Sequence, residues 1–193
     1  MRILAALAII AALTAGAASA QTATAIFAGG CFWCMEPPFD KTDGVISTTS
    51  GYAGGEKTDP TYEEVSAGGT GHIETVKIEY DPAKVSYEKL LDIYWRNVDP
   101  FDASGQFCDK GQHYRSAIFY GNETEKALAE ASKKRVAEKF GKAVETLILP
   151  ASKFYPAEDY HQDYYQKNPL HYKFYRYGCG RDARLEAVWG KSG

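Results

Sequence analysis

The 193-residue chain has little cysteine, little excess charge and no long hydrophobic run, and each shortage excludes a class of protein. Four cysteines are too few for a small fold held together mainly by disulfides. A net charge of −3 provides no positive surface to attract nucleic acid. The 18 glycines and 8 prolines are scattered, which argues against disorder and against a collagen-like repeat. The length suits one domain with a substantial core.

The most hydrophobic segment lies at the N-terminus and has the layout of an export signal. Arg2 forms a short positive region, an apolar run extends from Ile3 to Leu13, and the small residues Ala18-Ser19-Ala20 follow where a signal peptidase would cleave. The run is too short to span a bilayer, which takes about 20 residues. We therefore expect residues 1–20 to be a signal peptide and residues 21–193 to be a periplasmic or secreted domain. An uncleaved anchor is the alternative. Because such compartments oxidise thiols, thiol chemistry there needs a delivered reductant.

Hydrophobic periodicity predicts strands and helices that do not alternate regularly. Strands are expected at residues 24–28, 45–50, 72–80, 116–120 and 146–149. Helices are expected from Cys31 onwards, after Ser86, from Asn122 to about residue 140, and at 159–166. Loops are expected at residues 51–55 and 98–115. The pattern favours one α+β domain with two layers.

The sharpest chemical signal is the run Gly29-Gly30-Cys31-Phe32-Trp33-Cys34. It places Cys31 after a predicted strand and at the start of a predicted helix, where free N–H groups and the helix dipole favour a thiolate. The thiolate is the nucleophilic form of cysteine. The two glycines leave room for a substrate to approach. We therefore interpret Cys31 as a catalytic nucleophile, with a small buried cysteine that only packs in the core as the alternative.

Glu74 is the second signal, because strand alternation places it on an apolar face. In an extended strand over residues 72–80, Glu74 shares a face with Val76, Ile78 and Tyr80. Desolvation there would keep its carboxyl group protonated at neutral pH, as a general acid requires. The alternative is a surface carboxylate on an edge strand, since the face depends on the register.

Tyr62, Asp109 and Tyr114 are weaker signals when each is taken alone. A tyrosine hydroxyl is a good donor to a polar oxygen, but most tyrosines in a chain with 14 of them pack with only the hydroxyl in water. His161 lies among the C-terminal tyrosines and is interpreted as a surface residue.

The run Gly30-Cys31-Phe32-Trp33 resembles the signature of the peptide methionine sulfoxide reductase A family. Further segments match the family in its own order: Gly51-Tyr52-Ala53-Gly54-Gly55, Pro60-Thr61-Tyr62, Gly69-Thr70-Gly71-His72-Ile73-Glu74, Tyr80-Asp81-Pro82, Ser86-Tyr87, Asp99-Pro100, Asp109-Lys110-Gly111-Gln112-His113-Tyr114-Arg115-Ser116, Ala157-Glu158-Asp159-Tyr160-His161-Gln162 and Lys167-Asn168-Pro169. The resemblance covers most of residues 25–170. It implies a compact two-layer α/β sandwich with a mixed central sheet and a ferredoxin-like core, which is consistent with the α+β domain expected from the pattern.

Carried over position by position, the resemblance implies roles for five polar residues. Cys31 resembles the nucleophile that attacks the sulfoxide sulfur, and Glu74 resembles the acid that protonates the sulfoxide oxygen. Tyr62 and Tyr114 resemble donors to that oxygen, and Asp109 resembles a polar partner near them. One well-placed donor of this kind is worth about 3 kcal/mol in a water-poor site.

The resemblance also implies the substrate and the partners. Phe32 and Trp33 resemble the apolar wall that receives the substrate's methyl group. The expected substrate is the S epimer of methionine sulfoxide, free or in oxidised proteins and peptides, and the expected role is repair of oxidative damage. Attack leaves a sulfenic acid on Cys31, which a second thiol converts to a disulfide that thioredoxin or a thioredoxin-like dithiol reopens. We expect a monomer with no bound cofactor or metal, no nucleic acid and no stable membrane insertion after leader cleavage.

The resolving thiol has three candidates. Cys179 is preferred, because Gly178 and Gly180 flank it in a setting suited to movement. Cys34 follows closely, since it lies one helical turn from Cys31. For Cys108, a relay role and a structural pairing are equally supported. The sequence departs here from the best-known family pattern, in which a glycine is frequent at the position of Cys34 and the tail cysteine lies earlier.

Three other functions are considered. A general thiol–disulfide oxidoreductase fits Cys31-x-x-Cys34 but does not explain Glu74 or residues 109–116. A zinc module would need a second close pair of cysteines. An aromatic-rich carbohydrate- or protein-binding module is the third. Turnover of methionine sulfoxide with a dithiol distinguishes the reductase from all three, while metal content and insulin reduction test the zinc module and the oxidoreductase.

Overall fold

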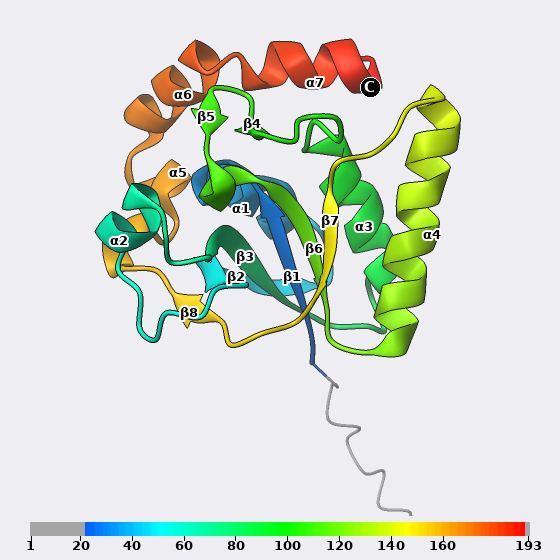
Figure 1. Ribbon diagram of the computed structural model, residues 1–193, viewed down its shortest axis with the longest axis horizontal. Helices are drawn as coiled ribbons and strands as arrows, with labels where there is room; N and C mark the ends of the chain where they lie inside the picture. The colour runs from blue at the N-terminus through cyan, green and yellow to red at the C-terminus, as the bar shows by residue number, and fades with distance from the viewer. Residues whose placement is uncertain (1–21, 192–193) are drawn as a thin grey trace, which may run out of the picture.

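The computed structural model describes residues 22–191, which are built around a six-stranded mixed sheet (Figure 1). In sheet order the strands are β7 (Leu147–Pro150), β6 (Ser116–Tyr120), β1 (Ala23–Gly29), β3 (Ile73–Tyr80), β2 (Val45–Ala53) and β8 (Tyr155–Pro156). Neighbours in this sheet are antiparallel, except that β6 and β7 are parallel. The order β6-β1-β3-β2, with helical crossovers after β1 and β3, is a ferredoxin-like core. The predicted fold class is confirmed.

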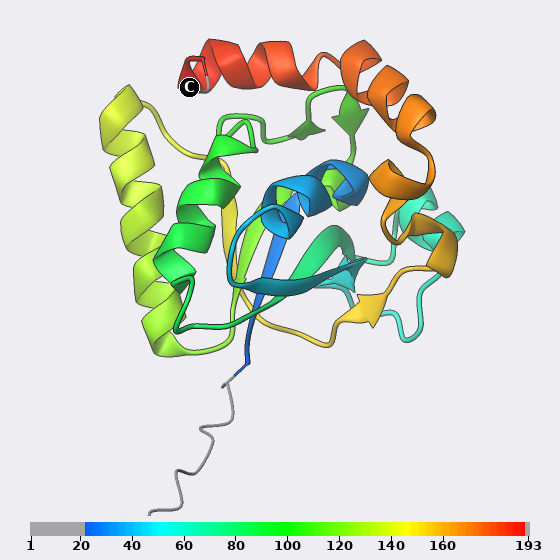
Figure 2. The ribbon, with the colours of Figure 1, turned by 180° about the vertical axis from the view of Figure 1, so that it is seen from behind.

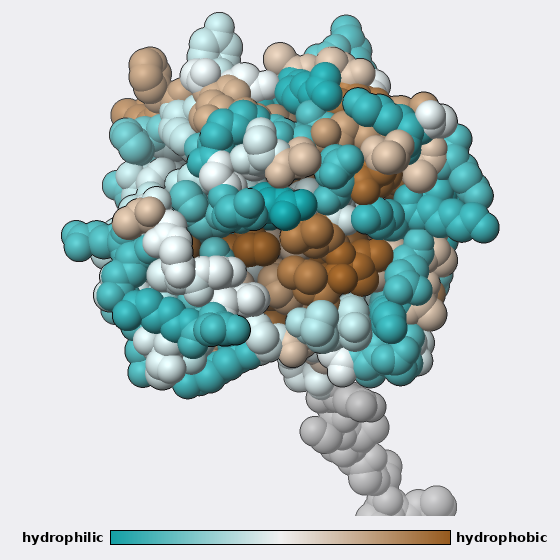
Figure 3. All heavy atoms as spheres, in the orientation of Figure 1, coloured by the Kyte–Doolittle hydropathy of each residue, from teal (hydrophilic) through white to brown (hydrophobic). Residues whose placement is uncertain are grey.

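Three helices cover one face of the sheet, as Figure 2 shows. They are α1 (Phe32–Asp40), α3 (Tyr87–Arg96) and α4 (Glu123–Phe140). The main core fills the space between them and the sheet, and its largest fully buried apolar side chains include Phe27, Phe39, Tyr94, Leu90 and Leu91. The other face carries a smaller cluster of buried apolar side chains. Ile26, Leu147 and Leu149 pack against this cluster and remain partly exposed (Figure 3). The domain therefore has the predicted two layers.

The remaining elements surround one end of the sheet. They are α2 (Tyr62–Ala67), the hairpin of β4 (Gly105–Gln106) and β5 (Asp109–Lys110), two 3-10 turns (Gln112–Tyr114 and Asp159–His161), α5 (Tyr164–Lys167), α6 (Pro169–Gly178) and α7 (Arg181–Trp189). The sequence did not indicate α6 or α7. Few of their side chains are buried, so local packing contributes little to these helices, and contacts with the rest of the domain hold them in place.

The predicted leader, residues 1–20, lies outside the described residues. Within residues 22–191, every helix is too short or too polar to cross a bilayer.

Two predicted helix starts are confirmed by side-chain caps. Ser86 accepts a hydrogen bond from the Lys89 backbone N–H at 3.1 Å before α3, and Asn122 accepts one from the Glu125 N–H at 2.9 Å before α4. Helix α4 ends at Gly141, whose φ of +59° is the left-handed conformation that favours glycine. Local chemistry thus determines where these helices begin and end.

Strand β2 continues through Gly51-Tyr52-Ala53, which the sequence indicated as a loop. A Cβ atom on Gly51 would lie 2.3 Å from Phe154 Cζ and 2.4 Å from the Tyr155 carbonyl oxygen. The missing side chain therefore allows β8 to pair with this end of β2, whose other edge is paired with β3 through Ala53.

A buried arginine fastens α7 to the sheet. Arg181 Nη2 donates to the carbonyl oxygen of Gly29 at 3.1 Å and to that of Asn97 at 2.7 Å. Its guanidinium also lies 4.4 Å from the centre of the Phe107 ring. The start of α7 is therefore held beside the end of β1, where Cys31 follows.

Helix α1 buries an acidic side chain, which makes the stability of the fold depend on pH. Glu36 is buried against the sheet and accepts a hydrogen bond from Ser50 Oγ at 2.8 Å. Burial raises the pKa of Glu36 to about 7. Because the folded state holds this proton more tightly than the unfolded state, the free energy of unfolding falls as pH rises from about 4.5 to about 7.

We expect Glu36→Gln to remove this loss of stability, which reaches about 3 kcal/mol at most. Urea denaturation at pH 5 and pH 8 measures it: the wild type should lose more stability over this interval than the variant, whose remaining loss comes from other buried acids such as Glu74. Glu88→Gln at the exposed start of α3 is the control and should follow the wild type. Parallel pH profiles for the wild type and Glu36→Gln would contradict the prediction.

Candidate active site

One small cavity collects the residues that the sequence singled out. Its volume is about 60 Å³, enough for a group the size of two water molecules. Eight residues line it: Cys31, Phe32, Trp33, Tyr62, Glu74, Asp109, Tyr114 and Tyr175. Seven of these are the predicted catalytic and substrate-binding residues, and they come from five separate segments of the chain. A larger hollow of about 720 Å³ is lined mostly by exposed loop residues between Gly54 and Gly71, without a cysteine or a buried acid among them.

The backbone before Cys31 is shaped by contacts within the protein. Gly30 has a φ of +80°, and a Cβ atom there would lie 2.6 Å from Gln106 Cβ. A Cβ atom on Gly29 would lie 2.5 Å from Met35 Sδ. Cys31 then occupies the N-cap position of α1. The two glycines therefore allow close packing against Gln106 and Met35.

Cys31 and Cys34 share a proton in the substrate-free site. Burial raises the pKa of the Cys31 thiol, and its hydrogen bond with Cys34 raises it further. The same hydrogen bond lowers the pKa of Cys34 to about 6, and the positive charges of Arg181 and Arg176 also favour the Cys34 thiolate. The expectation of a resting thiolate on Cys31 is therefore wrong. A helix terminus contributes at most about 2 kcal/mol, whereas burying a charge costs several.

Glu74 is a buried acid on an interior strand. Strand β3 lies between β1 and β2, and Glu74 is 2% exposed, so the alternative of a surface carboxylate on an edge strand is wrong. Burial raises the pKa of Glu74 well above its usual range, although a hydrogen bond from the Phe32 N–H to Oε2 at 3.1 Å lowers it. Glu74 is therefore protonated at neutral pH and can donate a proton into the cavity.

Two tyrosine hydroxyls complete this donor group. Tyr62 begins α2 and Tyr114 ends a 3-10 turn, and their hydroxyl groups are hydrogen-bonded to each other. Burial raises the pKa of both, so both remain protonated donors. Glu158 accepts the Tyr62 backbone N–H at 2.8 Å and the Tyr52 hydroxyl at 2.9 Å. It thereby fixes the start of α2 against the sheet.

The apolar wall depends on a histidine that the sequence placed at the surface. His161 is buried, which corrects that interpretation. Trp33 Nε1 donates to His161 Nδ1 at 3.1 Å, and the Trp33 ring stacks on Tyr164 with 3.8 Å between ring centres. Burial lowers the pKa of His161 and keeps it neutral, as an accepting Nδ1 requires. The Phe32 ring lies 4.9 Å from the same imidazole.

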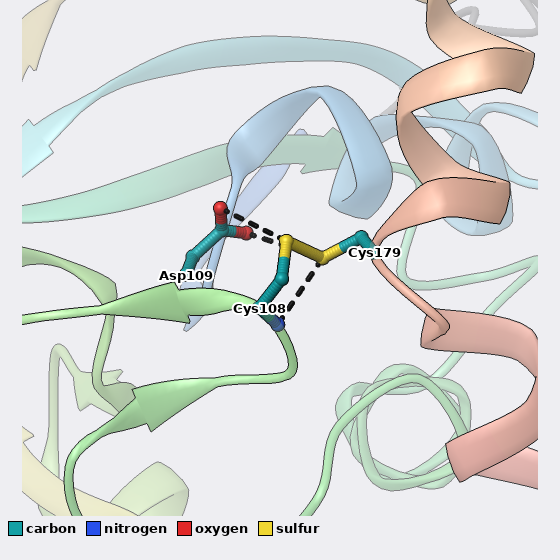
Figure 4. A group of neighbouring side chains, drawn as sticks. All are labelled: Cys108, Asp109 and Cys179. Atoms are coloured by element: carbon teal, nitrogen blue, oxygen red, sulfur yellow. Dashed lines mark hydrogen bonds between the residues drawn. A yellow bond between two sulfur atoms is a disulfide. The ribbon is translucent and has the colours of Figure 1, made fainter.

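Cys108 and Cys179 are joined in a disulfide (Figure 4). Cys108 lies in the turn between β4 and β5, and Cys179 caps the end of α6. The Asp109 carboxylate points towards the bond, with Oδ1 3.5 Å from the Cys108 sulfur and Oδ2 4.0 Å from the Cys179 sulfur. Cys179 is therefore anchored rather than mobile, and both sulfurs are occupied by each other.

The same three side chains bring possible metal ligands within 4.8 Å of one another. A metal would need thiolates, and sulfurs bonded in a disulfide are not thiolates. The geometry of this group therefore fits a disulfide beside a carboxylate better than a metal site.

Tyr175 is the lining residue that the sequence analysis missed. Its hydroxyl donates to Asp109 Oδ2 at 2.6 Å and is also hydrogen-bonded to Cys31. The only sequence signal was that half of the 14 tyrosines lie beyond residue 150. That clustering does not distinguish the one tyrosine that faces the cavity, because the helix that carries it was not predicted.

Comparisons with known proteins agree with this geometry. A sequence model of the family described as peptide methionine sulfoxide reductase matches residues 23–193. The peptide methionine sulfoxide reductase MsrA of Bacillus licheniformis is 52% identical over 169 residues, which cover 86% of this chain and 93% of that protein.

Solved structures share the fold. Reduced Mxr1 from Saccharomyces cerevisiae superposes with a TM-score of 0.73 at 33% identity, covering 81% of this chain and 91% of that one. Mxr1 in complex with Trx2 has a TM-score of 0.53 at 25% identity, covering 79% and 91%. The match over residues 23–193 and the relative of 52% identity establish that the chain belongs to the peptide methionine sulfoxide reductase family.

Proposed function

We propose that the protein repairs oxidised methionine, reducing the S epimer of free and peptide-bound methionine sulfoxide. One observation carries the proposal: a single small cavity places the Cys31 sulfur among protonated donors from Glu74, Tyr62 and Tyr114. A sulfoxide sulfur is a poor electrophile until its oxygen is protonated or strongly hydrogen-bonded. The cavity supplies a nucleophile for the sulfur and acids for the oxygen. Phe32 and Trp33 form the apolar side that would receive the methyl group.

The reductive step moves the proton that Cys31 and Cys34 share onto Cys34 and consumes the proton of Glu74. Cys31 passes its proton to the Cys34 thiolate and attacks the sulfoxide sulfur, while Glu74 protonates the oxygen. The oxygen leaves the substrate and remains on Cys31 as a sulfenic acid, and methionine is released. The substrate gains two electrons and Cys31 loses two. The S-epimer selectivity rests on the family membership.

Cys34 is the proposed resolving thiol. It lies one turn along α1 and is hydrogen-bonded to Cys31, and after the reductive step it carries the proton that it took from Cys31. Cys179, the first choice from the sequence, is bonded to Cys108 instead. Attack by Cys34 on the sulfenic acid releases water and forms a Cys31–Cys34 disulfide, which an external dithiol reduces.

Peptide mass spectrometry after one equivalent of substrate without reductant tests both parts of this proposal. We expect one methionine per chain and a disulfide linking Cys31 to Cys34. Cys34→Ser should still release methionine once, more slowly than the wild type because the acceptor of the Cys31 proton is lost, and then stop, leaving a sulfenic acid on Cys31 that a dimedone probe captures. A disulfide between Cys31 and Cys179 or Cys108 would overturn the assignment of Cys34, and the absence of methionine would overturn the function.

The proposed reductant is thioredoxin or a thioredoxin-like dithiol. Support comes from Mxr1, which has been solved in complex with Trx2. Steady-state turnover with a thioredoxin system, compared with turnover in its absence, measures this dependence.

The proposed location is the periplasm or the extracellular space. The positive, apolar and small-residue regions of residues 1–20 support export, and the mature protein is then residues 21–193, proposed to act as a monomer. Intact mass of the protein recovered from an envelope fraction tests cleavage after Ala20. Light scattering of the same sample tests the monomer.

A further inference from the structure

Helix α6 contributes a hydroxyl group to the cavity but has little packing of its own. All residues of α6 are described, and among them only Tyr172 is buried. Leu170, Phe174 and Tyr177 are 82%, 80% and 86% exposed. Because few apolar contacts hold the helix, its own burial does not fix the position of Tyr175 to the fraction of an ångström that catalysis requires.

One hydrogen bond and one disulfide connect this helix to neighbouring residues at the edge of the active site. The Tyr175 hydroxyl donates to Asp109 Oδ2 at 2.6 Å. The residue before Asp109 is Cys108, and one helical turn after Tyr175 is Cys179. The disulfide between these cysteines links positions 71 residues apart, and the Cys108 N–H donates to the Cys179 sulfur at 3.2 Å. The disulfide, shown beside Asp109 in Figure 4, therefore joins the two chain segments that carry the partners of the Asp109–Tyr175 hydrogen bond.

The held tyrosine acts on the nucleophile. Its hydroxyl has one proton, which is donated to Asp109 while Cys31 is a thiol. When Cys31 ionises, the hydroxyl can turn and donate to the sulfur, and this hydrogen bond lowers the pKa of Cys31 against the effect of burial. The Tyr175 ring also meets Trp33 edge to face, with 5.8 Å between ring centres. Movement of α6 would therefore change both the sulfur that attacks and the wall that receives the methyl group.

We propose that Tyr175 provides a third catalytic hydroxyl group and that the Cys108–Cys179 disulfide holds it in position. This disulfide stays oxidised throughout the catalytic cycle and is not reduced and re-formed with each turnover. The inference rests on the proposed function, because it concerns the same cavity. It assigns all electron transfer to Cys31 and Cys34, whose two thiols supply the two electrons that one sulfoxide consumes. Asp109 accordingly holds Tyr175 in place, and α7 is held separately through Arg181.

The decisive measurement separates methionine formation from regeneration of the enzyme. Single-turnover methionine formation without reductant and steady-state turnover with thioredoxin are compared for wild type, Tyr175→Phe and the double variant Cys108→Ser/Cys179→Ser. We expect both variants to form methionine at least about tenfold more slowly in the single turnover, since small displacements of reacting groups carry costs of this size. Both should still be regenerated by thioredoxin. A normal single turnover followed by failed regeneration in the double variant would show instead that these cysteines relay electrons, and would overturn the proposal.

A second readout needs no substrate and is therefore independent of the proposed function. Alkylation of Cys31 by iodoacetamide, followed across pH by peptide mass spectrometry, reports the ionisation of that sulfur. Loss of the Tyr175 hydroxyl should shift the Cys31 profile to higher pH in Tyr175→Phe, whose disulfide is intact even if the double variant fails to fold. Tyr177→Phe changes a tyrosine two residues away that is 86% exposed, and it should match wild type in every assay. An unchanged Cys31 profile in Tyr175→Phe would contradict the proposed hydroxyl.

Discussion

A Cys31→Ser variant is expected to form no methionine from methionine sulfoxide while retaining the wild-type fold. A serine hydroxyl cannot replace the sulfur nucleophile, because it is far less acidic and does not form a stable equivalent of the sulfenic acid. The change removes little volume at the N-cap of α1, where serine is also a favoured residue. Single-turnover assays without reductant give the cleanest measurement, since they do not depend on regeneration.

The matched control is Cys34→Ser, which changes the neighbouring buried thiol. That variant should release up to one methionine per chain, whereas Cys31→Ser should release none. Circular dichroism and thermal unfolding establish that both variants are folded. Methionine formation by folded Cys31→Ser at a rate near that of wild type would remove the basis of the proposed mechanism.

Glu74→Gln is expected to slow the reductive step by roughly 100-fold or more, the usual range for losing a general acid or an oxyanion donor. Glutamine preserves the shape of the side chain and can still accept the Phe32 N–H hydrogen bond, but it cannot give up a proton. Glu79→Gln on the same strand is the control. Glu79 is partly exposed and paired with Lys77, so its substitution should leave the rate unchanged.

The pH dependence gives this prediction a second test. In the wild type, the rate of the reductive step should fall below about pH 6, because the Cys34 thiolate that accepts the Cys31 proton is then lost. It should also fall at high pH as Glu74 loses its proton, at a pH well above the ordinary range for a carboxyl group because burial raises the pKa of Glu74. Glu74→Gln should lose only the alkaline decline. An unchanged alkaline limb would assign that ionisation to another group.

The sequence was sufficient where the controlling chemistry is local. Hydrophobic alternation located β1, β3, β6 and β7, and the caps at Ser86 and Asn122 located α3 and α4. Alternation along β3 also predicted the burial of Glu74 from its own strand. The family motifs, which span most of the chain, identified seven residues of the cavity before any of them could be placed in space.

The sequence was insufficient where an outcome depends on residues far apart in the chain. The pairing of Cys108 with Cys179, the burial of His161 and the presence of Tyr175 in the cavity all arise from how the C-terminal segment folds back over the sheet. Local propensity carries no information about such contacts.

The protonation of Cys31 shows most clearly the difference between local properties and properties that depend on the folded structure. From the sequence, a cysteine at the start of a helix is expected to ionise, because the helix dipole is a local property. Only the tertiary structure buries that sulfur and places Glu74 near it, and together with the neighbouring Cys34 these effects outweigh the dipole. The sequence thus determined which residues carry the chemistry, and the folded structure decided their charge and their partners, because desolvation and long-range contacts exist only once the chain has folded.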